Sequence, residues 1–248
     1  MKPKKIDILG VWFNFVTFDE VQNILMEYLD GDTPRAVFTP NPEFVMLSRK
    51  NKSFKNALNA ADLCIPDGIG IVLASRFGKH KLRRRVTGYD TTLSIFNKIK
   101  NTDKTVYFYG SAPGVAIEAK EKLEATYPGL KIIGVRDGYI DEDAQNEMIM
   151  EIQQIKPDIL LVGTGFPKQE LWIMKHKETL PCKILMGVGG QLDGFSGRVP
   201  RVPAVIGNMG LEWLYRLVRQ PKRWRRQLQL PLFMLAVLGD WVYNWFKR

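Results

Sequence analysis

Short apolar runs alternate with amphipathic stretches between residues 6 and 188 of the chain. The apolar runs that predict strands are residues 6–13, 36–39, 63–65, 106–109, 131–135, 159–162 and 184–188. Most of these runs are continuously apolar instead of alternating, which indicates strands buried on both faces. Strands of this kind, separated by helices, predict an α/β fold with a Rossmann-like, mostly parallel sheet flanked by helices.

The clearest helical pattern begins at Thr17. Thr17 and Glu20 have the spacing of a capping box, in which each side chain bonds the backbone N–H of the other residue. One face of this helix carries the apolar residues Val21, Ile24, Leu25, Tyr28 and Leu29. Residues 115–127, 143–155 and 168–177 predict further helices between the strands.

The loops that follow the predicted strands are rich in glycine and proline, and most also carry a polar residue. They are residues 39–43, 66–70, 110–114, 136–139, 163–170 and 187–193. In open α/β sheets, ligands bind at the carboxyl ends of the strands, where these loops would lie together. Any one of them has the composition of a plain turn, but their repetition indicates a ligand site.

Asp67 follows the predicted strand 63–65 and precedes Gly68 and Gly70. One interpretation is a turn or helix-capping aspartate. The other is a carboxylate that a ligand approaches closely, because the glycines lack side chains. Such a carboxylate is ionised at neutral pH and can accept a proton, more effectively if burial raises its pKa. The residues alone leave both interpretations open.

Other polar residues of these loops also have two interpretations. Asn41, before Pro42, has the pattern of a helix N-cap, and the alternative is that Thr39 and Asn41 hydrogen-bond a sugar or phosphate. Arg85 ends the basic run 81–85. Such a run is usually a solvated face, but Arg85 adjoins an expected glycine turn and could point inward to a phosphate. Gln169, taken alone, is typical of a surface residue.

The glycines of residues 110–114, 163–165 and 187–190 could supply backbone N–H groups for a diphosphate. None of these loops matches G-x-G-x-x-G or the P-loop pattern, which disfavours dinucleotide or ATP binding. The acidic run 141–143 has the D-x-D spacing of metal-using sugar transferases. It stands at a helix start, however, where acidic residues favour the helix dipole, so we expect a cap and no metal site.

The composition is that of an ordinary globular protein, with 45% hydrophobic and 25% charged residues among 248. A core of this size needs neither a disulfide nor a metal. Cys64 and Cys182 lie in apolar runs and are expected to be reduced core residues, with a disulfide as the alternative. A predicted strand follows the basic start of the chain, so we expect no signal peptide and a cytoplasmic protein.

The net charge of +10 is concentrated near the C-terminus. Residues 198–248 hold ten Lys or Arg and two acidic residues, while residues 1–197 have a net charge of +2. We therefore expect an α/β domain over 1–197 and a basic, amphipathic appendage over 198–248. The charge of this appendage predicts an anionic partner, which is a phospholipid, a nucleic acid or a phosphorylated substrate.

The expected appendage interleaves aromatic residues with arginines. Four arginines would form one stripe on a continuous helix: Arg216, Arg219, Arg223 and Arg226. Pro221 lies between them and favours a break instead. The apolar stretch 230–239 is too short to span a bilayer, which needs ~20 residues. Its neighbouring tryptophans suit a membrane interface, so we expect an interfacial helix; packing on the core or on a sister subunit is the alternative.

Taken together, the loops resemble those of the WecG/TagA/CpsF family of bacterial glycosyltransferases. The matching segments, in order over almost the whole chain, are residues 39–43, 66–70, 85–90, 165–170, 187–190 and 210–216. The likeness is greatest to the wall teichoic acid branch of the family. It implies metal-independent, inverting transfer of N-acetylmannosamine from UDP-ManNAc to the GlcNAc of undecaprenyl-diphosphate-GlcNAc, without a cofactor.

The resemblance also implies roles for individual residues. Asp67 would be the general base, and Arg85 would offset charge on the diphosphate. Sugar or phosphate contacts would come from Thr39, Asn41 and Gln169, with Gln169 counted among the catalytic residues. Diphosphate and nucleoside contacts would come from Gly110, Gly187, Gly189, Gly190 and Asp193. The appendage would complete the site through Arg216, Arg223 and Arg226. The chain departs from the family pattern at Gly194, where a phenylalanine is usual, and at Gln220, where an acid is common.

The resemblance makes the expected partners a UDP-sugar, a lipid-linked acceptor, an anionic membrane surface and a second copy of the chain, but no nucleic acid. The expected location is the inner face of the bacterial cell membrane. One alternative is transfer of a related UDP-sugar, such as a ManNAc uronic acid, in another polysaccharide pathway. A second is a nucleic-acid-binding protein, which only the basic, aromatic appendage supports. A nicotinamide-dependent oxidoreductase is disfavoured by the glycine loops.

Overall fold

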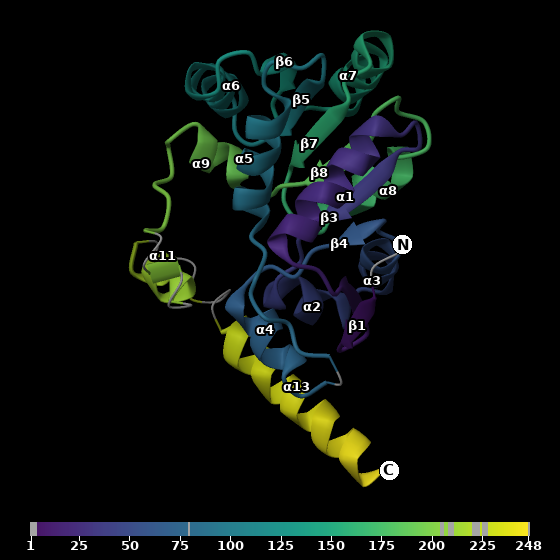
Figure 1. The fold of residues 1–248 in the computed structure, drawn as a ribbon, viewed down its shortest axis with the longest axis vertical. Coiled ribbons are helices and arrows are strands. Elements are labelled where there is room, and N and C mark those ends of the chain that lie inside the picture. The colour runs from purple at the N-terminus through teal and green to yellow at the C-terminus, as the bar shows by residue number, and fades with distance from the viewer. Residues whose placement is uncertain are drawn as a thin grey trace.

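The core of the protein is a six-stranded parallel sheet with the strand order β4-β3-β8-β7-β5-β6. The computed structural model describes residues 4–78, 80–203, 206–207, 211–219, 224 and 228–247, without the side chain of residue 216. The strands are β3 (Arg35–Phe38), β4 (Leu63–Cys64), β5 (Thr105–Gly110), β6 (Lys131–Arg136), β7 (Ile159–Gly163) and β8 (Ile184–Gly187). The predicted α/β class with a parallel sheet is confirmed (Figure 1).

Helices cover both faces of the sheet (Figure 1). One face packs against α1 (Phe18–Asp30), α5 (Gly88–Ile99), α6 (Val115–Thr126) and α9 (Gln191–Phe195). On the other side, one hydrophobic cluster joins the sheet to α2 (Pro42–Ser48), α3 (Lys52–Asn59), α4 (Ile69–Ser75), α7 (Glu142–Ile155) and α8 (Lys168–His176), and α13 (Gln229–Phe246) adds to it by packing on α2 and α4. Along β7, Leu160 and Val162 join the second cluster while Ile159 and Leu161 join the first. The strands are therefore buried on both faces, as their continuous apolar runs predicted.

The first predicted strand, residues 6–13, is wrong as a single element. Two antiparallel strands, β1 (Lys5–Ile8) and β2 (Val11–Asn14), form a separate hairpin. The chain turns at Leu9 and Gly10, which both have positive φ, and the Gly10 N–H donates to Asp7 Oδ1 at 2.6 Å. The tight turn contains no polar cluster, which is why the apolar pattern hid it.

Two helix starts place the residues that matter for function. The predicted N-cap of α2 is confirmed, because Asn41 Oδ1 accepts from the Glu43 N–H at 2.9 Å. The sequence pattern predicts no helix at α5, and the glycine turn expected beside Arg85 is wrong. Thr87 is its N-cap, with Oγ1 accepting from the Asp90 N–H at 3.1 Å. Gly88 is thus the first residue of a helix and not a turn.

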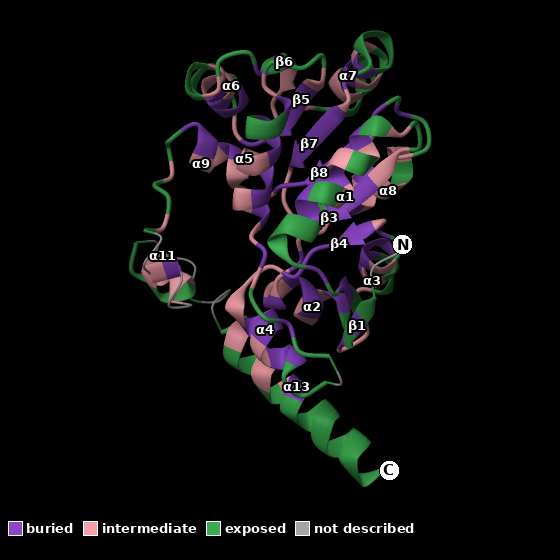
Figure 2. Cartoon of the chain, in the orientation of Figure 1, coloured by how far each residue is buried: buried purple, intermediate pink, exposed green. Residues whose placement is uncertain are grey.

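The last described helices, α11 (Glu212–Arg219) and α13, follow the body of the protein. Phe233 and Val237 on α13 are buried against α2 and α4, so one stripe of this helix packs on the core. The rest of α13 is largely exposed and extends beyond the body (Figure 2). Within the described residues, no helix combines the length and the apolar character needed to cross a bilayer.

Candidate active site

Three strand ends bring the candidate residues together at one edge of the sheet. Thr39 directly follows β3, Asp67 follows β4, and Gln191 begins α9 after β8. Gly88 lies among them, since a Cβ on it would be 2.8 Å from both Thr39 Oγ1 and Gln191 Nε2. The Gly88 N–H also donates to Asp67 Oδ2 at 3.3 Å. This cluster at the carboxyl edge is the position that the loops predicted.

The backbone around Asp67 is held on two sides. The Asp67 N–H donates to the Pro40 carbonyl at 3.3 Å, and the Val86 N–H donates to the Pro66 carbonyl at 3.1 Å. Asp67 therefore joins the loop after β3 to the segment that leads into α5. Its side chain does not cap α4, because the N-cap residue of that helix is Gly68, with a φ of 88°. Asp67 is therefore not the N-cap of α4; its carboxylate accepts from the first N–H of α5 instead.

Burial and, to a smaller extent, the nearby Glu212 carboxylate raise the pKa of Asp67 to about 6. The Gly88 N–H and the Arg85 guanidinium act in the opposite direction and lower this pKa. At pH 7 and above the carboxyl group is still mostly ionised, yet it binds a proton more tightly than an ordinary aspartate. These are the properties of a general base.

Arg85 is partly buried beside Asp67, while Arg83 and Arg84 are exposed. The solvated face is confirmed for Arg83 and Arg84, whereas Arg85 is turned partly away from solvent. Arg85 Nη1 pairs with Glu212 Oε2 on α11 at 2.7 Å. The distance brings a residue of the expected appendage to the edge of the site.

Gln169 is buried, and the expectation of a surface residue is wrong. Its Oε1 accepts from the Gly165 N–H at 3.2 Å and from the Gly189 N–H at 3.0 Å, while its Nε2 donates to Glu170 Oε1 at 2.6 Å. One amide group therefore ties the loop after β7 to the loop after β8. A Cβ on Gly187 would lie 2.9 Å from Gln169 Nε2, so this glycine makes room for the amide.

The remaining glycines divide between packing and open space. A Cβ on Gly110 would collide with the backbone of Gly163, so Gly110 serves strand packing. Gly189 has a φ of 53° and open space where a side chain would be. Near Gly190, Asp193 Oδ2 accepts from Ser111 Oγ at 3.1 Å. These residues line the carboxyl ends of β5, β7 and β8, on the side of the sheet away from β4.

Gly194 replaces the bulkier residue that the family pattern favours. A Cβ at this position would lie 2.9 Å from Cε2 of Tyr89. The ring of Tyr89 also packs against Phe195 at 4.7 Å and lies under the Arg201 guanidinium. The tyrosine therefore fills the space that a phenylalanine at residue 194 would need.

The acidic run 141–143 and the two cysteines have structural roles. Asp141 caps α7 by accepting from the Ala144 N–H at 2.9 Å, which confirms the capping interpretation of run 141–143. Among the described residues there is no cluster of three His, Cys, Asp or Glu side chains that could hold a metal. Cys64 and Cys182 are free and buried, and burial raises the pKa of each thiol to about 12.

Several predicted contacts lie outside the described residues. They are the side chain of Arg216 and all of Arg223 and Arg226. Three residues of the site were missed by sequence reasoning: Glu170, Gln191 and Glu212. Glu170 and Glu212 stood within the matching segments, and Gln191 stood within a glycine loop, so the signal was present without an assigned role.

The fold and the site together define a class of protein. A parallel α/β sheet carries a basic carboxylate at its carboxyl edge, with an arginine and open glycine loops beside it. Such an arrangement can accept a proton at the carboxylate and offers positive charge to a phosphorylated group, which is the chemistry of group-transfer enzymes.

The comparison with known proteins specifies the family. The model of the glycosyl transferase WecG/TagA/CpsF family matches residues 6–246, and the chain belongs to this family. An N-acetylglucosaminyldiphosphoundecaprenol N-acetyl-beta-D-mannosaminyltransferase of Bacillus spizizenii is 37% identical over 218 residues, covering 88% of this chain and 84% of that protein. The enzyme of the same name from Staphylococcus aureus strain MRSA252 is 33% identical, covering 94% of this chain and 92% of that protein.

Proposed function

We propose that the chain transfers N-acetylmannosamine from UDP-ManNAc to the GlcNAc of undecaprenyl-diphosphate-GlcNAc, giving the β-linked disaccharide of wall teichoic acid linkage synthesis. The acceptor oxygen forms a bond to the anomeric carbon, and the bond from that carbon to the β-phosphate oxygen of UDP breaks. The hydroxyl proton passes to Asp67, and UDP leaves with the bonding electrons. Attack from the face opposite UDP inverts the anomeric centre. The activities for which the relatives are named support this donor sugar and acceptor.

The observation that carries the proposal is the carboxylate of Asp67 at the carboxyl edge of the sheet. Its pKa of about 6 makes it a stronger base than an ordinary aspartate while it stays mostly ionised above pH 7. The first N–H of α5 points at it, so the side chain has a fixed direction. A general base needs this combination of protonation state and geometry.

The departing diphosphate needs positive charge. In the proposal Arg85 supplies it next to Asp67, and Arg216, Arg223 and Arg226 add to it from the appendage. The ion pair of Arg85 with Glu212 supports this arrangement, because it joins α11 to the edge of the site.

Contacts with the UDP-sugar are proposed for the loops that follow β3, β7 and β8. Thr39 would bind the sugar, since its hydroxyl faces the start of α5. Asn41 and Gln169 would act through the loops that their protein hydrogen bonds hold in place. The nucleoside would bind along the open backbone of Gly189 and beside Asp193.

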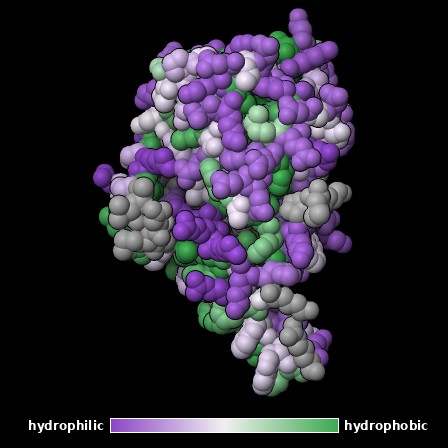
Figure 3. Space-filling view, viewed as in Figure 1, coloured by the Kyte–Doolittle hydropathy of each residue, from purple (hydrophilic) through white to green (hydrophobic). Residues whose placement is uncertain are grey.

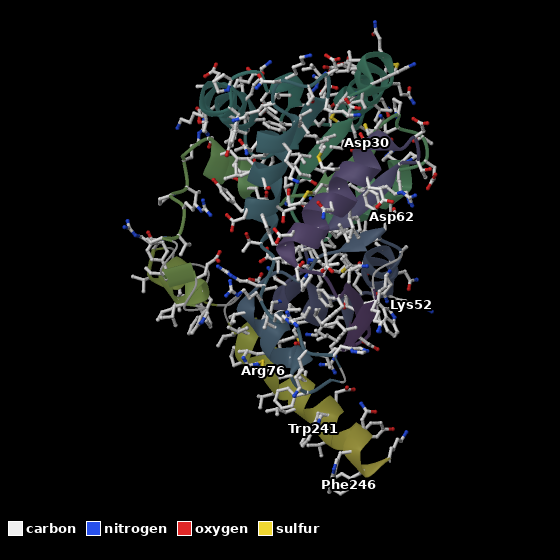
Figure 4. The ribbon with its side chains drawn as sticks, viewed as in Figure 1. Asp30, Lys52, Asp62, Arg76, Trp241 and Phe246 are labelled. Carbon is white, nitrogen blue, oxygen red and sulfur yellow. The ribbon has the colours of Figure 1, made fainter. Side chains whose placement is uncertain are left out.

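The acceptor is a membrane lipid, so the enzyme must work at a bilayer surface. Many apolar residues on α13 are exposed: Leu232, Leu235, Leu238, Trp241, Val242, Tyr243, Trp245 and Phe246. Trp241 and Phe246 lie on the part of α13 that extends away from the sheet (Figure 4). Figure 3 shows hydrophilic side chains over much of the visible face and hydrophobic ones where α4 meets α13. We infer that α13 lies in the interface of the inner face of the cell membrane, as a peripheral contact.

The test of the proposed function is the release of UDP from UDP-ManNAc in the presence of a lipid-linked GlcNAc diphosphate. The variant Asp67→Asn should lower kcat by roughly 10² to 10⁴, because the general base is removed. The control Asp143→Asn removes an exposed carboxylate on α7 and should leave kcat unchanged. Wild-type turnover in Asp67→Asn would contradict the role of the base. A faster reaction with a UDP-ManNAc uronic acid would favour the alternative donor.

A further inference from the structure

The ion pair between Arg85 and Glu212 joins residues that are 127 positions apart in the chain. Arg85 Nη1 and Glu212 Oε2 are 2.7 Å apart, and both side chains are largely shielded, with exposed fractions of 20% and 29%. The segment before α11 adds a second contact, since a Cβ on Gly207 would lie 2.9 Å from Arg85 Nη2. Two separate points of the C-terminal segment therefore close on one guanidinium group.

This guanidinium group belongs to the site because the segment that follows it is hydrogen-bonded to Pro66 and to the Asp67 carboxylate. The Val86 N–H donates to the Pro66 carbonyl at 3.1 Å, and the Gly88 N–H donates to Asp67 Oδ2 at 3.3 Å. Arg85 thus begins a stretch that runs along residues 66 and 67. Glu212 therefore acts on the Asp67 carboxylate through the Arg85 guanidinium, which it contacts directly.

We propose that Glu212 is a positioning residue of the site, which holds the Arg85 guanidinium in place and offsets part of its charge next to Asp67. The proposal builds on the proposed function, in which Asp67 accepts the proton. The C-terminal segment then contributes a carboxylate to the site in addition to the predicted arginines.

An unbalanced arginine next to a carboxylate favours the ionised form and makes that carboxylate a weaker base. A second carboxylate on the arginine reverses part of this effect. The charges that act on Asp67 agree with this sign, since Arg85 lowers its pKa and Glu212 raises it. The bond from Glu212 uses Nη1, and the guanidinium group has further N–H donors for a phosphate.

Charged residues on the other elements around Asp67 have their own positions. Asp90 in the first turn of α5 pairs with Arg201 and accepts from Thr87. Glu43 lies in the first turn of α2, next to the cap residue Asn41, and has an interaction partner of its own. Neither residue is among the charges that shift the pKa of Asp67, which are those of Glu212 and Arg85.

The first test measures the titration of Asp67 by NMR in the full chain with ¹³C-labelled aspartate, and Asp67→Asn identifies the signal. In Glu212→Gln the midpoint should fall by roughly one pH unit, the size expected for one charge a few ångströms away near a surface. The control Glu121→Gln removes an exposed carboxylate on α6 and should leave the midpoint in place. An unchanged midpoint in a folded Glu212→Gln protein would overturn the proposal. This titration uses no substrate, so its result does not depend on the proposed reaction.

The second test is the pH profile of kcat/KM. In Glu212→Gln the acid limb should move down by the same unit, so that well below pH 5 the variant keeps about a tenfold larger fraction of its maximum than wild type. Glu212→Asp preserves the charge and should restore the wild-type limb. A uniform loss of activity with an unmoved limb would show a merely structural residue and reject the proposal. An inactive wild-type enzyme together with a shifted Asp67 titration would instead reject the proposed function alone.

Discussion

Two shielded carboxyl groups at the carboxyl edge of the sheet hold protons more tightly than ordinary side chains. Asp67 is shifted by burial and by Glu212, and its pKa is about 6. Glu170 is 1% exposed, and burial raises its pKa to about 7 against the opposing effect of the Gln169 amide. Glu170 Oε2 has no hydrogen-bond partner among the described residues. The two groups lead to different predictions, because Asp67 is the proposed general base and Glu170 is buried in the protein interior.

The pH dependence of catalysis should follow Asp67. The base must be ionised, so kcat/KM should fall as the pH drops through about 6 and approach a tenfold loss per unit below it. A steady-state profile between pH 4.5 and 8.5 measures this limb. A limb near the ordinary aspartate value of ~4 would show that Asp67 is solvated in the working enzyme.

The stability of the protein should depend on Glu170 in a defined pH window. Its folded pKa of about 7 lies above its ordinary value of 4.5, so the folded state holds the proton longer than the unfolded chain. The free energy of unfolding should therefore fall between pH 4.5 and 7, by on the order of 3 kcal/mol, and level off above. Asp67, with its pKa of about 6, adds a slope of its own below pH 6. In urea unfolding series Glu170→Gln should therefore remove the slope between pH 6 and 7 and reduce it below pH 6, and the exposed control Glu147→Gln should keep both parts. If the free energy of unfolding changes with pH in the same way in both variants, Glu170 is not the group responsible.

Individual side chains show where sequence reasoning was limited. The capping role of Asn41 was predictable because its partners lie two and three residues away. The burial of Gln169 was not, because its partner Gly189 is twenty positions away on another strand end. The pairing of Arg85 with Glu212 is still less local. Local hydrogen bonds are encoded in short patterns, whereas these contacts exist only once the sheet has formed.

At the scale of elements, α13 has one buried face and one exposed face. Phe233 is fully buried and lies near Gly70 on α4, while Leu235 is 65% exposed. The buried stripe therefore packs on the core, as one of the two interpretations predicted, while the exposed residues leave the interfacial helix as a prediction. Helical spacing separates residues 233 and 235 onto different faces.

Truncation of the buried stripe should weaken the docking of α13. Phe233→Ala should lower the free energy of unfolding by about 3–5 kcal/mol, because it removes a fully buried ring. Leu235→Ala is the matched control and should change it by no more than about 0.5 kcal/mol. Urea unfolding of both variants measures the difference. Equal stabilities would mean that α13 is detached from α2 and α4 in solution.

At the scale of the whole molecule, positive charge and exposed apolar residues are both concentrated in the C-terminal segment of the chain. The first 197 residues are nearly neutral, and a net charge of +8 lies in the last 51. The same region carries the exposed aromatic residues of α13. The last 51 residues of the chain thus combine most of the net charge with the exposed apolar residues of α13, and Glu212 joins this segment to the carboxyl edge of the sheet.

The full chain should bind vesicles that contain anionic phosphatidylglycerol more tightly than neutral vesicles, and added salt should reduce the difference. Replacing Trp245 and Phe246 with serine should weaken binding by at least about tenfold, since both rings are exposed on α13. Tyr139→Ser removes an exposed ring from the body and is the control. Vesicle co-sedimentation measures these affinities, and equal binding by all three proteins would exclude α13 as the contact. The division of the chain after residue 197 remains a prediction.

The sequence by itself determined the class of fold, most of the strands, the helix caps and the segments that mark the family, because these depend on periodicity and on contacts within a few residues. It also contained Asp67 and Arg85 as candidates, but left each with two interpretations. Only the tertiary structure decided their surroundings, by placing Asp67 where burial and Glu212 raise its pKa and by pairing Arg85 with Glu212. Burial and charge are properties of the assembled strand ends, and no short stretch of the chain contains them.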